Sequence, residues 1–90
     1  MWIWVQAKPK ADATPDAIMQ KRRDWLRQGK DRDLAGRCGS AWRYVVEGTK
    51  PAEVFWILET EDRDAVKILT EHFKDLWELT VHEVRPEALG

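Results

Sequence analysis

The last third of the chain carries the side chains whose chemistry is easiest to name. Residues alternate between Leu76 and Arg85, so Glu78, Thr80 and His82 share one face of an expected strand, about 7 Å apart at each step. An imidazole titrates near neutral pH, and a carboxylate beside it would orient it. His82 and Glu78 are therefore the candidate catalytic pair, suited to moving a proton within a substrate. The alternative is a histidine that is hydrogen-bonded for structure at a strand edge or an interface.

A second set of residues would bind a small molecule. Arg43 lies in the middle of an expected strand, where a charge needs a partner, and a guanidinium can hold a carboxylate through two hydrogen bonds. A salt bridge between subunits would satisfy it as well. The residues that would add an aromatic wall and polar contacts are Trp4, Trp42, Tyr44, Gln6 and Glu59. Core or dimer packing is the alternative for the aromatics, and a charge cluster at a helix start is the alternative for Glu59.

Metal and redox chemistry have no template in this sequence. His72 and His82 lie on different expected elements with no HxxxH or ExxH spacing, so we expect no metal site. Cys38 is the single cysteine and has no partner for an intramolecular disulfide or a CxxC motif. His72, near the end of an expected helix, fits a surface or capping role. No residue pattern indicates a cofactor.

Composition limits the class of protein. The 90 residues form one domain, 1–90, and 43% hydrophobic with 34% charged residues is typical of globular chains. No apolar run could cross a membrane, and the start MWIWVQAKPK lacks the regions of a signal peptide, so we expect a cytoplasmic protein. A net charge of −1 argues against a dedicated nucleic-acid binder. Neither membranes nor nucleic acids are expected partners.

Charge is unevenly distributed along the chain. Lys21 to Arg37 holds seven basic residues against three acids, whereas Glu47 to Glu83 holds ten acids against four bases. Such asymmetry can steer self-association or attract an anionic ligand. The simpler interpretation of this charge distribution is that the charged residues lie on the solvent-exposed surfaces of two helices.

Hydrophobic periodicity predicts four strands and two helices. Thr14 is a good N-cap for the first helix and Gly29 a good stop. The segment GKDRDLAGRCGS is expected to be a glycine-rich connector between that helix and the next strand. In chain order the expected elements are a strand at 1–8, a helix at 15–28, strands at 40–47 and 54–60, a helix at 62–74 and a strand at 76–85.

This element order predicts an α+β fold, the ferredoxin-like βαββαβ sandwich, in which right-handed crossovers place both helices on one face of a four-stranded antiparallel sheet. The other face of the sheet is then uncovered. Five of the six tryptophans fall in the expected strands, at positions 2, 4, 42, 56 and 77. So much aromatic surface favours burial of the uncovered face, and we expect a homodimer.

The chain resembles the dimeric α+β barrel superfamily over most of its length. The stretch AWRYVVEGTKPAEVFWILETEDRDAVKIL is similar to the second strand, hairpin, third strand and second helix of muconolactone isomerase-like proteins. The stretch FKDLWELTVHEVRP is similar to their closing strand and to that of related uncharacterised prokaryotic families. Trp42 and Arg43 match the Trp-Arg pair of the muconolactone isomerase-like pattern, whereas the glycine-rich connector and the extra tryptophans depart from it.

The resemblance implies that two protomers press their open sheet faces together around a central cavity. The superfamily includes cofactor-free isomerases and monooxygenases, haem-degrading enzymes and ligand-sensing domains, so the fold does not select one activity. The first hypothesis is a homodimer that binds a small anionic or aromatic molecule in a pocket lined by Trp4, Arg43 and His82, with a cofactor-free isomerase as its catalytic form. The alternatives are a non-catalytic sensing or protein-interaction module and a monooxygenase or haem-binding protein.

Overall fold

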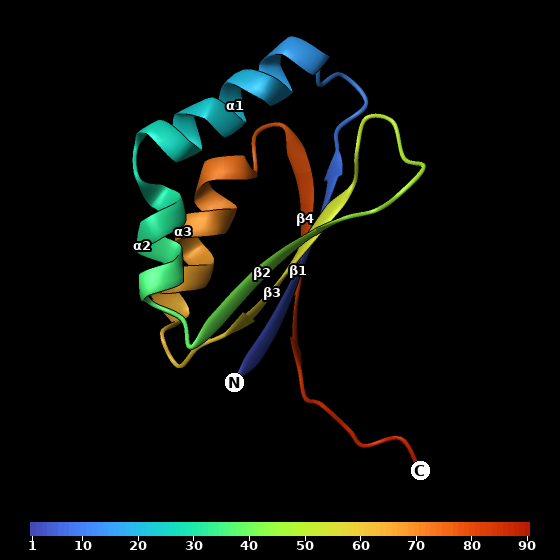
Figure 1. Ribbon diagram of the computed structural model, residues 1–90. Coiled ribbons are helices and arrows are strands. Elements are labelled where there is room, and N and C mark those ends of the chain that lie inside the picture. Colours follow the sequence, from blue (N-terminus) through green and yellow to red (C-terminus); the bar gives the residue numbers. More distant parts are fainter.

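The computed structural model describes residues 1–90 and contains four strands and three helices (Figure 1). In chain order they are β1 (Trp2–Pro9), α1 (Pro15–Arg27), α2 (Lys30–Gly36), β2 (Ser40–Val45), β3 (Val54–Glu59), α3 (Arg63–Phe73) and β4 (Trp77–Val84). All six expected elements are present, with ends that differ by no more than two residues. None of the three helices has the length and apolar character that a membrane span requires.

The four strands form one antiparallel sheet in the order β2-β3-β1-β4. All three helices lie on the same side of it, and no element covers the other side (Figure 1). The molecule is accordingly only 16 Å thick along its shortest axis. This arrangement confirms the predicted ferredoxin-like sandwich. We call the uncovered side of the sheet the open face and the other side the helix face.

The register of the strands assigns each side chain to one of these faces. On β1, Ile3, Val5 and Ala7 lie opposite Leu58, Trp56 and Val54 of β3, and all six are buried. The helices complete this core with Trp25, Leu34, Ala65, Leu69 and Phe73. The predicted alternation of residues 1–8 is therefore confirmed, with its odd-numbered positions on the helix face.

Helix α1 begins and ends as its sequence predicts. The side-chain oxygen of Thr14 accepts a hydrogen bond from the backbone N–H of Ala17 at 3.2 Å, and proline occupies the first helical position. The helix ends before Gly29, whose φ of +71° is a left-handed conformation that other residues adopt only with strain. The chain therefore turns sharply at Gly29.

The expected connector after Gly29 is wrong in one respect, because it contains the seven-residue helix α2. Leu34 is its one buried side chain, with 3% exposed, and it packs into the core. A helix of two turns that buries one residue leaves no measurable periodicity in the sequence. Contact with the rest of the fold therefore stabilises α2 more than its own pattern does.

His72 does not lie at the surface as expected. Its side chain is 6% exposed, because α1 lies across the end of α3 that carries it. Its Nε2 donates to the backbone oxygen of Lys21 at 2.9 Å, and Lys30 Nζ lies 3.0 Å from its Nδ1. The rings of Trp25 and Phe73 lie 5.2 and 4.7 Å from it. His72 therefore joins all three helices at one point.

Candidate functional site

The open face carries most of the candidate residues. Trp4 on β1 lies opposite Ile57 of β3 on one side and His82 of β4 on the other. Gln6, one step further along β1, lies between Phe55 and Thr80. The predicted placement of Glu78, Thr80 and His82 on one face of the last strand is confirmed, since their partners on β1 are the open-face residues Lys8, Gln6 and Trp4.

Four aromatic rings cross the open face in an unbroken line. Tyr44 of β2 stacks on Phe55 of β3 with ring centroids 4.9 Å apart and an angle of 16°. Phe55 meets Trp4 edge-on at 6.0 Å, and Trp4 lies 6.0 Å from the imidazole of His82. These separations are those of interacting aromatic pairs. Tyr44, Phe55, Trp4 and His82, one from each strand, are called the aromatic row below.

Solvent reaches much of this aromatic surface in a single copy of the chain. The exposed fraction is 64% for Trp42, 43% for Tyr44 and 36% for Trp4. Trp42 lies opposite Ile57, one step from the row, so the apolar surface is continuous. Four strands about 4.8 Å apart and some 20–25 Å long give the whole face, its polar residues included, an area of roughly 450 Å² in projection. Large exposed apolar patches mark interaction sites.

Polar residues lie at the two ends of the open face. At one end, Lys8 lies opposite Glu78. At the other, Glu59 lies opposite Trp2 and Ser40. Its backbone oxygen accepts a hydrogen bond from Gly39 N–H at 2.7 Å. A Cβ on Gly39 would lie 2.1 Å from Glu59 Oε2, so a glycine here leaves room for that carboxylate. The apolar centre thus has a polar rim, as binding surfaces commonly do.

The two candidate catalytic residues share the open face without meeting. They are four positions apart on β4, which corresponds to about 14 Å along an extended strand. No hydrogen bond links His82 to a carboxylate, and its nearest ring is Trp4. Within one protomer, Glu78 therefore cannot orient the imidazole.

Arg43 lies apart from the other candidates. It is opposite Trp56, so its side chain is on the helix face, between the two open-face positions Trp42 and Tyr44. The expected pocket lined jointly by Trp4, Arg43 and His82 is therefore wrong. The reason is strand geometry, because successive residues point to opposite faces.

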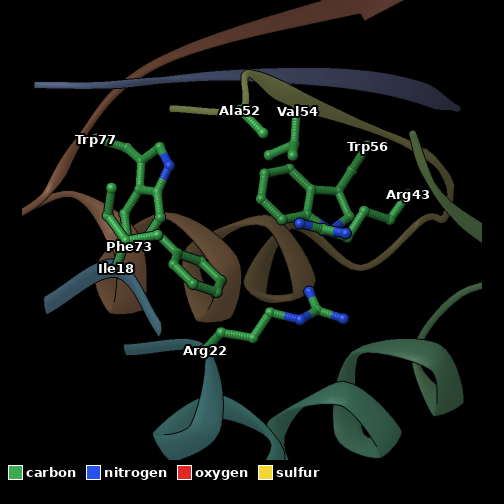
Figure 2. Close-up of a pocket in the computed structure, with 8 residues that line it drawn as sticks. All are labelled: Ile18, Arg22, Arg43, Ala52, Val54, Trp56, Phe73 and Trp77. Carbon is green, nitrogen blue, oxygen red and sulfur yellow. The ribbon is translucent and has the colours of Figure 1, made fainter. Parts of the chain in front are cut away.

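Arg43 instead lines a pocket of about 90 Å³ between the sheet and α1 (Figure 2). Arg22 of α1 enters the same pocket, and its place was not foreseen. The available signal was that Arg22 interrupts the apolar stripe of its helix. The other lining residues are Ile18, Ala52, Val54, Trp56, Phe73 and Trp77. Burial, and then the charge of Arg22, lowers the pKa of the Arg43 guanidinium, which stays protonated.

The tryptophans of the strands divide between the two faces. Trp56 and Trp77 are 6% and 7% exposed and belong to the core beneath the helices. Trp2, Trp4 and Trp42 are on the open face.

The structure contains no group of three histidine, cysteine or carboxylate side chains close enough together to hold a metal ion. Cys38 is half-buried, and burial raises the pKa of its thiol.

Comparison with known proteins adds to this geometry. No protein-family model and no curated protein matches the chain. Among solved structures, the fold is similar to that of At3g17210 from Arabidopsis thaliana, with a TM-score of 0.56 and 13% identity over 99% of this chain and 97% of that one. The structural genomics protein YJCS aligns at a TM-score of 0.46 and 21% identity, over 94% and 100% of the two chains. CutA1 from Pyrococcus horikoshii aligns at 0.39 and 17%, over 98% and 87%. The chain thus has the ferredoxin-like α+β fold, which it shares with At3g17210.

Proposed function

We propose that the protein is a homodimer that binds a small, flat organic molecule between its two open faces. The observation that supports this most directly is the aromatic row, four rings in line on the side of the sheet that no helix covers. The occupant of each open face would be a second copy of the same chain.

The exposed aromatic surface favours pairing of two copies. Large side chains such as Trp42 and Tyr44 cost free energy when they are left in water, about 25 cal/mol for each Å² of apolar surface. A 90-residue chain also buries a modest share of its surface by folding alone, so association adds needed stability. A two-fold axis would place the same apolar centre and polar rim on both partners, which makes the face self-complementary. The resemblance of the sequence to the dimeric α+β barrel superfamily supports the same pairing.

The chemistry of the face favours an aromatic ligand over an anion. The rings of Tyr44, Phe55 and Trp4 offer surfaces against which a flat molecule can stack. The polar groups that would orient it are Gln6 and Thr80, which lie opposite one another beside the row. The cation expected to hold an anion, Arg43, is on the other face.

Catalysis at this site depends on His82. It is the one imidazole of the aromatic row, so a cofactor-free isomerase would use it as acid or base. The carboxylate that orients it would come from the partner protomer, because Glu78 of the same protomer is about 14 Å away. Under this hypothesis His82→Ala abolishes turnover of the bound molecule while dimerisation persists. Unchanged turnover in that variant would exclude the histidine mechanism.

A protein-interaction module is the second candidate function. Large side chains such as Trp42 can fill the space between two sheets by themselves, and such an interface would leave no room for a ligand. The exposure of Trp42 in the single chain fits this function equally well. Ligand binding therefore has to be measured separately from dimerisation.

Analytical ultracentrifugation tests the dimer. The native chain should sediment at twice its protomer mass of 10.6 kDa. Tyr44→Lys places a charge in the aromatic row and should weaken dimerisation at least tenfold. Met19→Lys is the matched control, because Met19 is 52% exposed on α1, away from the open face. A native chain that is monomeric at 100 μM, or a control that dissociates as readily as Tyr44→Lys, would contradict the proposed pairing.

NMR spectroscopy tests the ligand. Each tryptophan contributes one indole N–H signal, and neutral 2-naphthol is a flat probe of suitable size. The probe should shift the signals of Trp4 and Trp42 and leave that of Trp25, buried among the helices, in place. If the chain dimerises but no open-face signal moves at millimolar probe, the interface is filled and the interaction module is the better description.

A further inference from the structure

The pocket beneath α1 has a polar end and an apolar end. Figure 2 shows the guanidinium groups of Arg22 and Arg43 at one end of it, beside Trp56, with Ile18, Phe73 and Trp77 towards the other. Six of its eight lining residues are hydrophobic. The two arginines reach the pocket from different elements, α1 and β2, so the tertiary fold brings them together. We call this space the arginine pocket.

Neither arginine has a carboxylate partner. Neighbouring basic side chains do: Lys21 pairs with Asp75, and Arg37 pairs with Asp33 and Asp62. No such ion pair forms at Arg22 or Arg43. Two guanidinium groups that line one small pocket repel each other, and the pKa of Arg43 is lowered first by burial and then by the charge of Arg22.

Asp31 is the one acid whose charge acts appreciably on Arg43. It lies on the opposite side of that arginine, among the residues that line a second, adjoining hollow. Its Oδ1 accepts the indole N–H of Trp25 at 3.1 Å, and its carboxylate forms no ion pair with Arg43. No carboxylate lines the arginine pocket, so the two guanidinium groups that face it have no ion-pair partner within the chain.

We infer that the arginine pocket binds a short-chain organic carboxylate. The carboxylate group lies between Arg22 and Arg43, because guanidinium groups bind it through charge-assisted hydrogen bonds. The hydrocarbon chain lies along Ile18, Phe73 and Trp77. This site is on the helix face and does not depend on pairing of the open faces.

The size of the pocket limits the length of the ligand. A pocket of about 90 Å³ is well below the roughly 300–1,000 Å³ of sites for drug-sized ligands. An acid with three to five carbons is the largest that fits without rearrangement. The apolar lining favours an organic acid over inorganic phosphate, because the phosphate oxygens that do not meet the arginines would lose hydration against Ile18 and Phe73, whose side chains have no hydrogen-bond donor.

NMR titration with three probes tests the inference on the native chain. Sodium butyrate carries both the charge and the hydrocarbon, butyramide has the same shape without the charge, and inorganic phosphate has the charge without the hydrocarbon. Butyrate should shift the indole N–H signals of Trp56 and Trp77. At constant ionic strength it should bind at least tenfold more tightly than either of the other two probes.

Three variants locate the site. Arg22→Gln and Arg43→Gln should each weaken butyrate binding at least tenfold. Arg23→Gln is the matched control, because Arg23 adjoins Arg22 on the same helix and does not line the pocket. It should leave the affinity within twofold.

The following results would overturn the inference. Butyramide or phosphate could bind as tightly as butyrate. Arg23→Gln could weaken butyrate binding as much as Arg22→Gln and Arg43→Gln do. The indole N–H signals of Trp56 and Trp77 could stay unshifted at 50 mM butyrate. Shifts confined to Trp4 and Trp42 would place the acid between the open faces and would also overturn it. The comparison of probes uses the native chain, so it stands even if a variant fails to fold.

Discussion

The buried imidazole of His72 should make the stability of the fold depend on pH. Its Nε2 must carry a proton, because a backbone oxygen, that of Lys21, can only accept. Its Nδ1 then carries a lone pair that accepts a hydrogen bond from the Lys30 ammonium. Burial is the largest cause that lowers the pKa of His72, and the charges of Lys30 and Lys21 lower it further, against opposing effects of the Lys21 hydrogen bond and Asp75. The neutral form is therefore the native form.

The sign of the dependence follows from these contacts. An unfolded histidine titrates near pH 6.5, whereas the folded His72 takes up its proton at lower pH. The unfolded state therefore binds more protons below about pH 6.5, and stability falls as the pH falls towards the folded pKa. One proton limits the slope to about 1.4 kcal/mol per pH unit. Between pH 6.5 and 5.5 the free energy of unfolding should fall by up to about 1 kcal/mol, because the unfolded histidine is half-protonated at pH 6.5, and above pH 7.5 this contribution is constant.

Urea unfolding at pH 7.5, 6.5 and 5.5, at fixed protein concentration, measures this slope. His72→Gln retains an amide that can donate to Lys21 and accept from Lys30, and it should remove the slope. Lys30→Met removes the facing ammonium, so it should raise the pKa of His72 in an NMR titration and reduce the slope. His82→Gln, on the open face, is the control and should keep the slope. If His72→Gln has the same pH dependence as the native chain, this assignment of protonation is wrong.

Three further substitutions test the packing and the helix ends by urea unfolding. Leu58→Ala should cost about 2–5 kcal/mol, because Leu58 is 0% exposed at the centre of the core, and a loss below about 1 kcal/mol would show that the site is not close-packed. Gly29→Ala should cost about 1–2 kcal/mol, because Gly29 has a left-handed backbone conformation. Gly36→Ala should be neutral or stabilising, because a Cβ there meets nothing within 4 Å. Equal effects of the two substitutions would contradict the left-handed conformation of Gly29. Thr14→Ala should cost about 1 kcal/mol through loss of the N-cap, and no change would show that the cap is unimportant.

The sheet could be predicted from the sequence because each strand has two distinct faces. In β1 the alternation separates Ile3 and Val5 from Trp4, and in β4 it separates Leu79 and Val81 from His82. A period of two leaves one register that buries the apolar set, so the faces follow from the pattern. The strand order follows from the element order and right-handed crossovers. The placement of the tryptophans was harder, because β3 is apolar on both sides and Trp56 could have faced either way.

Features that depend on contacts between helices could not be predicted. Helix α2 is too short to show a period, and Leu34 is buried only because the turn at Gly29 directs α2 back to the core. The same holds for His72, whose polar ring is covered because α1 supplies the Lys21 oxygen as a partner. Burial of a polar group depends on partners far away in the sequence, and periodicity does not report them.

Only part of the candidate site could be predicted. Trp4, Gln6, Tyr44 and His82 were correctly expected on one face, since parity along each strand decides that. Arg43 was grouped with them, although Arg43 and Tyr44 are successive residues of one strand and therefore lie on opposite faces. Its partner Arg22 comes from a helix, and no pattern within one element relates the two. Convergence of side chains from separate elements is the information that only the tertiary structure supplies.

The central claim, that two copies meet through their open faces, is tested most directly by NMR on a mixed dimer. One half of the protein is labelled with ¹³C and ¹⁵N and the other half is not, and only nuclear Overhauser effects between the two are recorded. We expect these contacts to involve Trp4, Trp42 and Tyr44 and to spare Met19 and Leu26, which are exposed on α1. Contacts through α1, or none in a sample concentrated enough to associate, would contradict the account.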